Sequence, residues 1–228
     1  MAILFIHGLF PAIYDPPADW LCPDLPGYGV ETAAAIGLPE AAEFLSGLIT
    51  EPVHLVGHSI GGAIAMLLAT NYPECVASVV NVEGNFTLND AFWSSRLAAM
   101  TAAQAEQEID RLRADPTGWL TNAGVPISPA TLAIAERSLA TPAKTIHAMA
   151  RSVVDITSKP AYLEHVRAVI DRGIPLHLIA GEHSRDAWDV PKFILTRAHS
   201  CLTQPEAGHM LMWNDQQAFV ELVEFAIQ

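Results

Sequence analysis

The segment Gly57-His58-Ser59-Ile60-Gly61 places a serine between two glycines, directly after the apolar run Val53-His54-Leu55-Val56. A serine hydroxyl is a weak nucleophile, and it becomes reactive when it is exposed at the end of a strand beside a base that takes its proton. The two flanking glycines let the backbone close into the tight turn that exposes it. The pattern therefore predicts a strand, a sharp elbow and a helix, with Ser59 as the nucleophile.

The residues after the serine predict a helix whose first turn faces the reacting group. Residues 60–71 are small and apolar, which suits a helix packed against a sheet. The first N–H groups of a helix have no partner within it, and the helix dipole is positive at that end. We therefore expect the backbone N–H of Ile60 to stabilise the oxyanion that develops when Ser59 attacks a carbonyl.

Alternating strand and helix patterns surround the elbow. Strands are expected at residues 3–6, 53–56 and 78–82, and helices at residues 33–49 and 60–71. Strands that alternate with helices are typical of the α/β class, in which helices cover both faces of a mostly parallel sheet. We expect about six strands, which is near the usual mean.

Residues 86–158 have helical spacing and no strand pattern. A helix is expected over residues 90–115, with Asp90 or the residue before it as its N-cap. Ser128 and Thr141 are each followed by proline, which is typical of an N-cap and the first helical position. This part of the chain is therefore predicted to be an all-helical insertion.

Composition excludes several classes of protein. Of the 228 residues, 51% are hydrophobic and 16% charged, which favours a folded domain over disorder. The net charge of −13 disfavours nucleic acid and anionic membranes as partners, and it favours a neutral or cationic small molecule. Three scattered cysteines argue against a disulfide framework and a zinc site. Without an apolar run of membrane-spanning length or a basic N-terminal region, a cytoplasmic protein is expected.

Four further motifs, together with the serine elbow, resemble the α/β-hydrolase family over nearly the whole chain. They are the strand running into His7-Gly8, the loop Asp24–Gly29, the late strand Pro175–Glu182 and the loop Ala207-Gly208-His209. The resemblance implies a core of residues 1–85 and 159–228, with residues 86–158 as a helical lid. It also implies that the backbone N–H of Leu9 is the second oxyanion donor, and it requires no metal or cofactor.

Among nine histidines, His209 is the best candidate for the general base. Histidine takes and returns a proton near neutral pH, and the fold implied by the resemblance needs one in a loop near the C-terminus, after the serine in the chain. His58 lies inside the elbow, where a packed or hydrogen-bonded side chain is expected.

The acid that should orient His209 is displaced from the family's usual position. There the sequence has Ser184, although a carboxylate is still needed to fix the tautomer of the histidine. Glu83 ends the predicted strand after the nucleophile's, and Asp186 lies two residues beyond Ser184. We favour Glu83, because a buried glutamate at a strand end needs a partner for its charge.

Together these residues predict a serine hydrolase, in the first instance a carboxylesterase acting on a small, neutral and partly apolar ester. Lactone, thioester and C–C bond hydrolysis remain alternatives, because the fold hosts them all. A ligand-binding or receptor-like protein with slow or no turnover is the alternative from another class. Large side chains that could line an apolar pocket are Phe86, Phe92, Trp93, Trp119, Trp188, Met210 and Met212.

Overall fold

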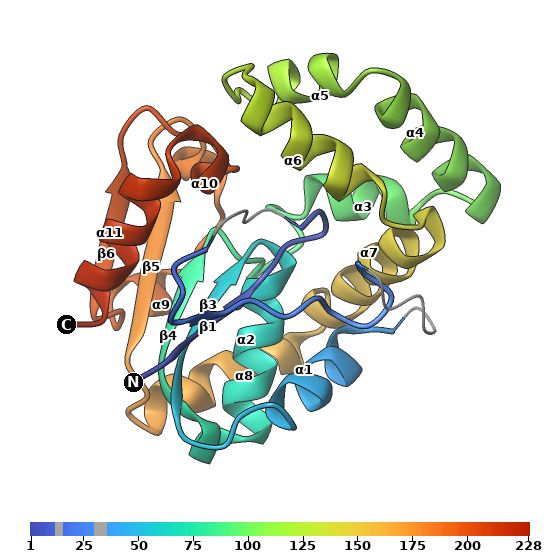
Figure 1. Ribbon diagram of the computed structural model, residues 1–228. Helices are drawn as coiled ribbons and strands as arrows, with labels where there is room; N and C mark the ends of the chain where they lie inside the picture. Colours follow the sequence, from blue (N-terminus) through green and yellow to red (C-terminus); the bar gives the residue numbers. More distant parts are fainter. Residues whose placement is uncertain (12–15, 30–35) are drawn as a thin grey trace.

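A computed structural model describes residues 1–11, 16–29 and 36–228 (Figure 1). Its centre is a sheet of six parallel strands in the order β2-β1-β3-β4-β5-β6. The strands are β1 (Ile3–Ile6), β2 (Trp20–Leu21), β3 (Val53–His58), β4 (Val76–Val82), β5 (Leu176–Gly181) and β6 (Ser200–Gln204). This architecture confirms the predicted α/β class and the predicted sheet of about six strands.

Helices cover both faces of the sheet (Figure 1). On one face lie α1 (Leu38–Ser46), α2 (Ile60–Asn71) and α8 (Pro160–Asp171), and on the other lies α11 (Gln216–Ala226). The α11 residue Phe219 packs edge-on against Phe5 of β1 and also contacts Trp20 of β2. Shorter helical turns are η1 (Pro73–Cys75), η2 (Arg185–Ala187), α9 (Lys192–Leu195) and α10 (Leu211–Asn214).

The helix expected at residues 33–49 is shorter in the structure. It begins at Leu38, after Gly37, whose backbone N–H donates to Glu40 Oε2 at 3.1 Å. Pro39 lies in the first turn, where its missing N–H costs no helical hydrogen bond. The part of the prediction that falls on residues 33–35 lies outside the described residues.

Between β4 and α8 the chain forms five helices and, among these described residues, no strand. They are α3 (Phe92–Ala98), α4 (Ala102–Ala114), α5 (Pro116–Asn122), α6 (Pro129–Leu139) and α7 (Ala143–Thr157). The helices α4, α5 and α6 extend beyond the carboxyl ends of the strands (Figure 1). The predicted helical character of this insertion is therefore observed, while its division from the core as a domain remains a prediction.

Two details of the insertion differ from the sequence-based predictions. The single helix expected from Asp90 is divided, because Thr101 caps a new helix by accepting from Gln104 N. The prediction that Asp90 or the residue before it is the N-cap is wrong, since α3 begins after Ala91. Ser128 caps α6 as predicted, but Thr141 does not cap α7, whose N-cap is the following residue.

Helix α7 joins the insertion to the core. It packs against α3 and α4 on one side and against α1 on the other. Ser152 in α7 accepts a hydrogen bond from the backbone N–H of Leu38, the first residue of α1, at 2.9 Å. The last helix of the insertion therefore belongs to the same packed layer as the helices of the core.

Within the described part of the chain, no helix is long and apolar enough to cross a membrane. The cytoplasmic location inferred from the sequence stays a prediction.

Candidate active site

Ser59 lies at a strained elbow between β3 and α2. Its backbone has φ 55° and ψ −123°, a conformation that costs about 1–3 kcal/mol in a residue other than glycine. A Cβ on Gly57 would clash with the carbonyl oxygen of Gly61, and a Cβ on Gly61 would clash with that of Ile6. The two glycines therefore permit the turn for a steric reason, as the sequence pattern predicts.

The loop after β1 approaches the elbow closely. A Cβ on Gly8 would lie 3.1 Å from the Cβ of Ser59, so the missing side chain leaves room for this approach. The loop is anchored by His7, whose Nδ1 donates to Gly8 O at 2.8 Å and whose Nε2 accepts from Leu25 N at 3.2 Å. Leu9, which follows Gly8 in this loop, lines the pocket that contains Ser59.

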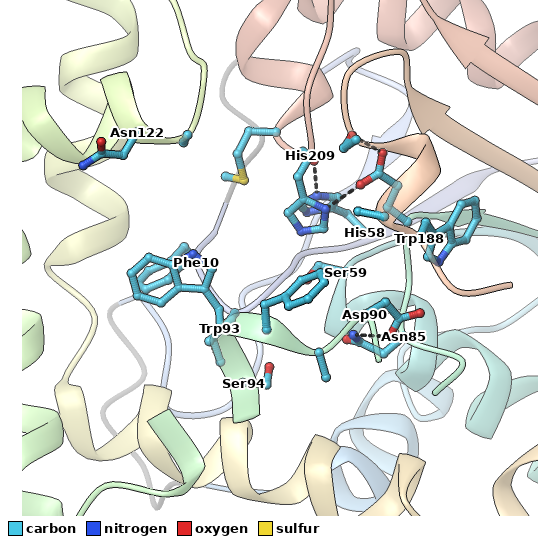
Figure 2. A pocket seen from close by; sticks show the side chains of 18 of the residues that line it. Phe10, His58, Ser59, Asn85, Asp90, Trp93, Ser94, Asn122, Trp188 and His209 are labelled. Carbon is cyan, nitrogen blue, oxygen red and sulfur yellow. Dashed lines mark hydrogen bonds and ion pairs between the residues drawn. The ribbon is translucent and has the colours of Figure 1, made fainter. Parts of the chain in front are cut away.

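Glu83 and His209 form a direct pair. Glu83 Oε2 lies 2.7 Å from His209 Nδ1, although 126 residues separate them in the chain. The glutamate side chain is only 4% exposed, while that of the histidine is 44% exposed and faces the cavity. Figure 2 shows His209 beside Ser59. Glu83 itself has a left-handed backbone, with φ 43°.

The second carboxylate oxygen of Glu83 is also occupied. Its Oε1 accepts from the backbone N–H of Gly181 at 2.7 Å and from the hydroxyl of Ser184 at 2.5 Å. Burial by itself raises the pKa of the Glu83 carboxyl, but the hydrogen bonds from His209, Ser184 and Gly181 outweigh it and leave the pKa below its usual value. Ser184, at the position where the family resemblance suggested an acid, is thus a hydrogen-bond donor to the Glu83 carboxylate.

Asp186 is not brought to His209. Its side chain is fully exposed on the short turn η2, and its nearest charged neighbour is Arg185 at 3.7 Å. Of the two carboxylates considered from the sequence, only Glu83 contacts the histidine.

The side chain of His58 is hydrogen-bonded, as the sequence predicts, but sequence reasoning did not identify its partner. Its Nε2 donates to the backbone carbonyl of His209 at 2.8 Å, and the two imidazole rings lie 4.8 Å apart. Burial and the neighbouring His209 lower the pKa of His58 to about 3, so its ring is neutral. The residue before the serine therefore fixes the loop that carries His209. The sequence signal for this contact is the place of His58 directly before Ser59, where its side chain is buried. A buried histidine needs a hydrogen-bond partner.

Ser59, Glu83 and His209 line one cavity of about 310 Å³ between the carboxyl end of the sheet and the insertion (Figure 2). Of the large side chains predicted to line it, five do: Phe92, Trp93, Trp119, Trp188 and Met210. The prediction is wrong for Phe86 and Met212, which are buried in the core. Phe10 was missed, and its ring contacts those of Trp93 and Trp119. Helices α3 and α5 of the insertion thus supply much of the aromatic wall.

Among the described residues, no group of three or more His, Cys, Asp or Glu side chains is arranged to hold a metal ion. The chemistry that the site supports directly is proton transfer through His209 and nucleophilic attack by a hydroxyl.

Comparison with known proteins places the chain in a family. Residues 3–222 match the profile of the alpha/beta hydrolase family, and the chain belongs to it. Over 79 residues it is 37% identical to the pimeloyl-(acyl-carrier protein) methyl ester esterase of Aeromonas hydrophila, a match that covers 33% of this chain and 31% of the esterase. The chain thus spans about a third of the length of this curated relative.

Solved structures share the fold over the whole chain. MenH from S. aureus has a TM-score of 0.74 at 15% identity, with 100% of this chain and 93% of that chain covered. A thermophilic esterase from Thermogutta terrifontis has a TM-score of 0.65 at 17% identity, with 100% and 91% covered. At these identities the likeness concerns the fold.

Proposed function

We propose that this protein is a carboxylic ester hydrolase in which Ser59, His209 and Glu83 form a catalytic triad. The observation that carries the proposal is the 2.7 Å contact between Glu83 Oε2 and His209 Nδ1, in the same cavity as a serine held at a strained elbow. Two relatives named as esterases, one by sequence and one by structure, support the same class of reaction.

The Glu83 contact supports Nε2 of His209 as the nitrogen that acts as the base. A carboxylate accepts hydrogen bonds, so Nδ1 carries the proton and Nε2 keeps its lone pair. In the proposed acylation step Ser59 Oγ bonds to the ester carbonyl carbon while Nε2 takes the hydroxyl proton. The imidazolium that forms is stabilised by Glu83, and it then protonates the departing alcohol oxygen.

Deacylation repeats these steps with water. Nε2 takes a proton from a water molecule, whose oxygen bonds to the acyl carbon, and the Ser59–acyl bond breaks as the proton passes to Oγ. The products are a carboxylic acid and the alcohol released earlier, and the enzyme returns to its starting state.

The backbone N–H groups of Leu9 and Ile60 are proposed to bind the oxyanion in both steps. Ile60 is the first residue of α2, where the N–H has no partner within the helix, and Leu9 lines the cavity beside the elbow. Loss of one such donor typically costs about 3–4 kcal/mol of transition-state stabilisation.

The insertion is proposed to act as a lid. Its residues Phe92, Trp93 and Trp119 line the cavity, so a bound ester would lie between the sheet and the insertion. An apolar cover that excludes water strengthens the electrostatic interactions of the site.

Labelling with a fluorophosphonate tests the proposal. The reagent should modify Ser59 covalently, and peptide mass analysis should locate the adduct there. The variant Ser59→Ala should lose labelling and lose hydrolysis of p-nitrophenyl esters by about 10⁴-fold or more. A wild-type protein that neither labels nor hydrolyses any ester in a series of increasing acyl length would instead support the ligand-binding alternative. Parallel assays with a lactone and a thioester distinguish the remaining bond types.

A further inference from the structure

Asp90 is a pocket carboxylate that the proposed triad does not use. It lines the cavity of Ser59, and in the view of Figure 2 Ser59 lies between His209 and the Asn85–Asp90 pair. Asn85 Nδ2 donates to Asp90 Oδ1 at 3.1 Å, which fixes the orientation of the carboxylate. Because Asp90 does not cap α3, helix formation does not explain its position.

The hydrogen bonds within the protein leave Asp90 with spare acceptor capacity. Besides Asn85, the backbone N–H of Phe86 donates to it at a long 3.4 Å, and the backbone N–H of Asp90 itself also interacts with the carboxylate. A carboxylate offers about four acceptor positions. Asn85 is itself 5% exposed, and its Oδ1 has no hydrogen-bond partner in the described structure. A buried amide oxygen without a hydrogen-bond partner lowers the stability of the fold by about 1–3 kcal/mol. The position of Asn85 therefore points to a role in the site rather than in stability.

The rest of the cavity wall suits a cation. Among the described lining residues there is no lysine or arginine to neutralise Asp90. The wall also contains five large aromatic side chains, Phe10, Phe92, Trp93, Trp119 and Trp188. Aromatic faces attract cations through the quadrupole of the ring, and a carboxylate adds a direct charge. The net charge of −13 raises the local concentration of cations around the molecule.

We infer that Asp90, held by Asn85 in a cavity with an aromatic wall, is a subsite for an ammonium group, so that the preferred substrates are cationic esters. This inference rests on the proposed esterase activity and names its substrate class. An ester that carries a carboxylate would meet the uncompensated charge of Asp90 and bind poorly.

The ionisation of Asp90 gives the subsite a characteristic pH dependence. Burial raises the pKa of Asp90 to about 6, with the nearby Asp189 also raising it and the bonds from Asn85 and Phe86 opposing the increase. The carboxylate is therefore charged above about pH 6 and increasingly neutral below it. Tyr162 of α8 interacts electrostatically with Asp90, but burial raises its pKa far above this range.

Matched ester pairs measure the subsite without reference to the triad. A choline ester and the corresponding 3,3-dimethylbutyl ester have nearly the same shape and differ in charge, and hydrolysis of both is followed by acid release. A second pair carries the trimethylammonium or the tert-butyl group on the acyl side instead. The ratio of kcat/KM within a pair cancels the contribution of the proposed triad, which acts on both members.

In at least one pair the cationic ester should be preferred by about tenfold or more above pH 7, and the preference should fall as the pH drops through about 6. Asp90→Asn should lower the ratio severalfold and remove its dependence on pH, leaving the smaller preference that the aromatic wall supplies. Asp186→Asn is the matched control, because it removes a charge near the cavity from a fully exposed position and should leave the ratio unchanged.

The possible outcomes separate this inference from the proposed function. Ester hydrolysis with a ratio near one in both pairs, or a preference that Asp90→Asn leaves undiminished, would overturn the ammonium subsite and leave the esterase proposal standing. Absence of both fluorophosphonate labelling and ester hydrolysis would instead remove the proposed function.

Discussion

At the scale of single residues, the site depends on how His209 is held from two sides. Glu83 contacts its Nδ1 and His58 contacts its backbone carbonyl, at 2.7 and 2.8 Å. The first contact sets the tautomer of the ring and the second sets the position of the loop. Each contact can be removed separately, so the two roles lead to different predictions.

Glu83→Gln should slow ester turnover by up to about 10⁴-fold. A glutamine amide can donate to Nδ1, which favours the tautomer that leaves Nε2 protonated and unable to act as the base. Measured kcat should fall with little change in thermal stability. Asp186→Asn, in contrast, should keep nearly all activity. An active Glu83→Gln together with an inactive Asp186→Asn would transfer the role to Asp186.

His58→Phe should lower kcat by about tenfold or more with little effect on KM. Phenylalanine fills the space of the imidazole ring, but it cannot donate a hydrogen bond to the His209 carbonyl. An unpaired buried carbonyl costs about 1–3 kcal/mol. His58→Gln retains a donor and should recover part of kcat. If both variants had the same kcat as the wild type, His58 would have no positioning role.

At the scale of elements, the elbow between β3 and α2 depends on close backbone contacts. Gly61 lies against the carbonyl oxygen of Ile6 in β1, so this strand and the helix after Ser59 are packed backbone to backbone. A side chain at this place has no flexible neighbour that can move aside, because the obstacle is the backbone of a central strand.

Gly61→Ala should therefore destabilise the protein by about 3 kcal/mol or more, or prevent folding. Gly47→Ala is a suitable control, since Gly47 follows α1 with φ −67° and a Cβ there meets its nearest atom at an ordinary 3.4 Å. The control should change the free energy of unfolding by less than about 1 kcal/mol. Denaturant unfolding of both variants measures the difference, and equal midpoints would contradict the packing argument.

At the scale of the whole molecule, the insertion is not uniformly attached. Helix α7 packs on both the insertion and the core, and Ser152 bonds to the start of α1. Helices α4–α6 extend beyond the sheet and have wide exposed faces (Figure 1). Hydrogen exchange of amides depends on local opening, and opening requires less free energy where fewer buried contacts are broken.

We expect the amides of α7 to exchange as slowly as those of α1 and α2, and the amides of α4 to exchange faster. Hydrogen-exchange mass spectrometry with peptides from each helix makes the comparison directly. Exchange of α7 at the rate of α4 would mean that the whole insertion opens as one unit, separate from the core.

The sequence by itself determined the elements that depend on near neighbours. The apolar run before Ser59, the glycines around it and the small residues after it predict β3, the elbow and α2, because strand, turn and helix preferences act over a few residues. Ser128 was identified as the cap of α6 for the same reason. The division between α3 and α4 was missed, since a helical pattern continues through the cap at Thr101.

Only the tertiary structure decided which distant groups meet. Parallel pairing of β4 with β5 places Val82 opposite Ile179, and the next residue, Glu83, then lies against Gly181 and reaches His209. The same register leaves Asp186 on an exposed turn beyond β5. The contact of His58 with the His209 loop and the position of Asp90 in the cavity arise in the same way. Such contacts depend on strand order, register and packing between segments far apart in the chain, and local sequence preferences do not specify these.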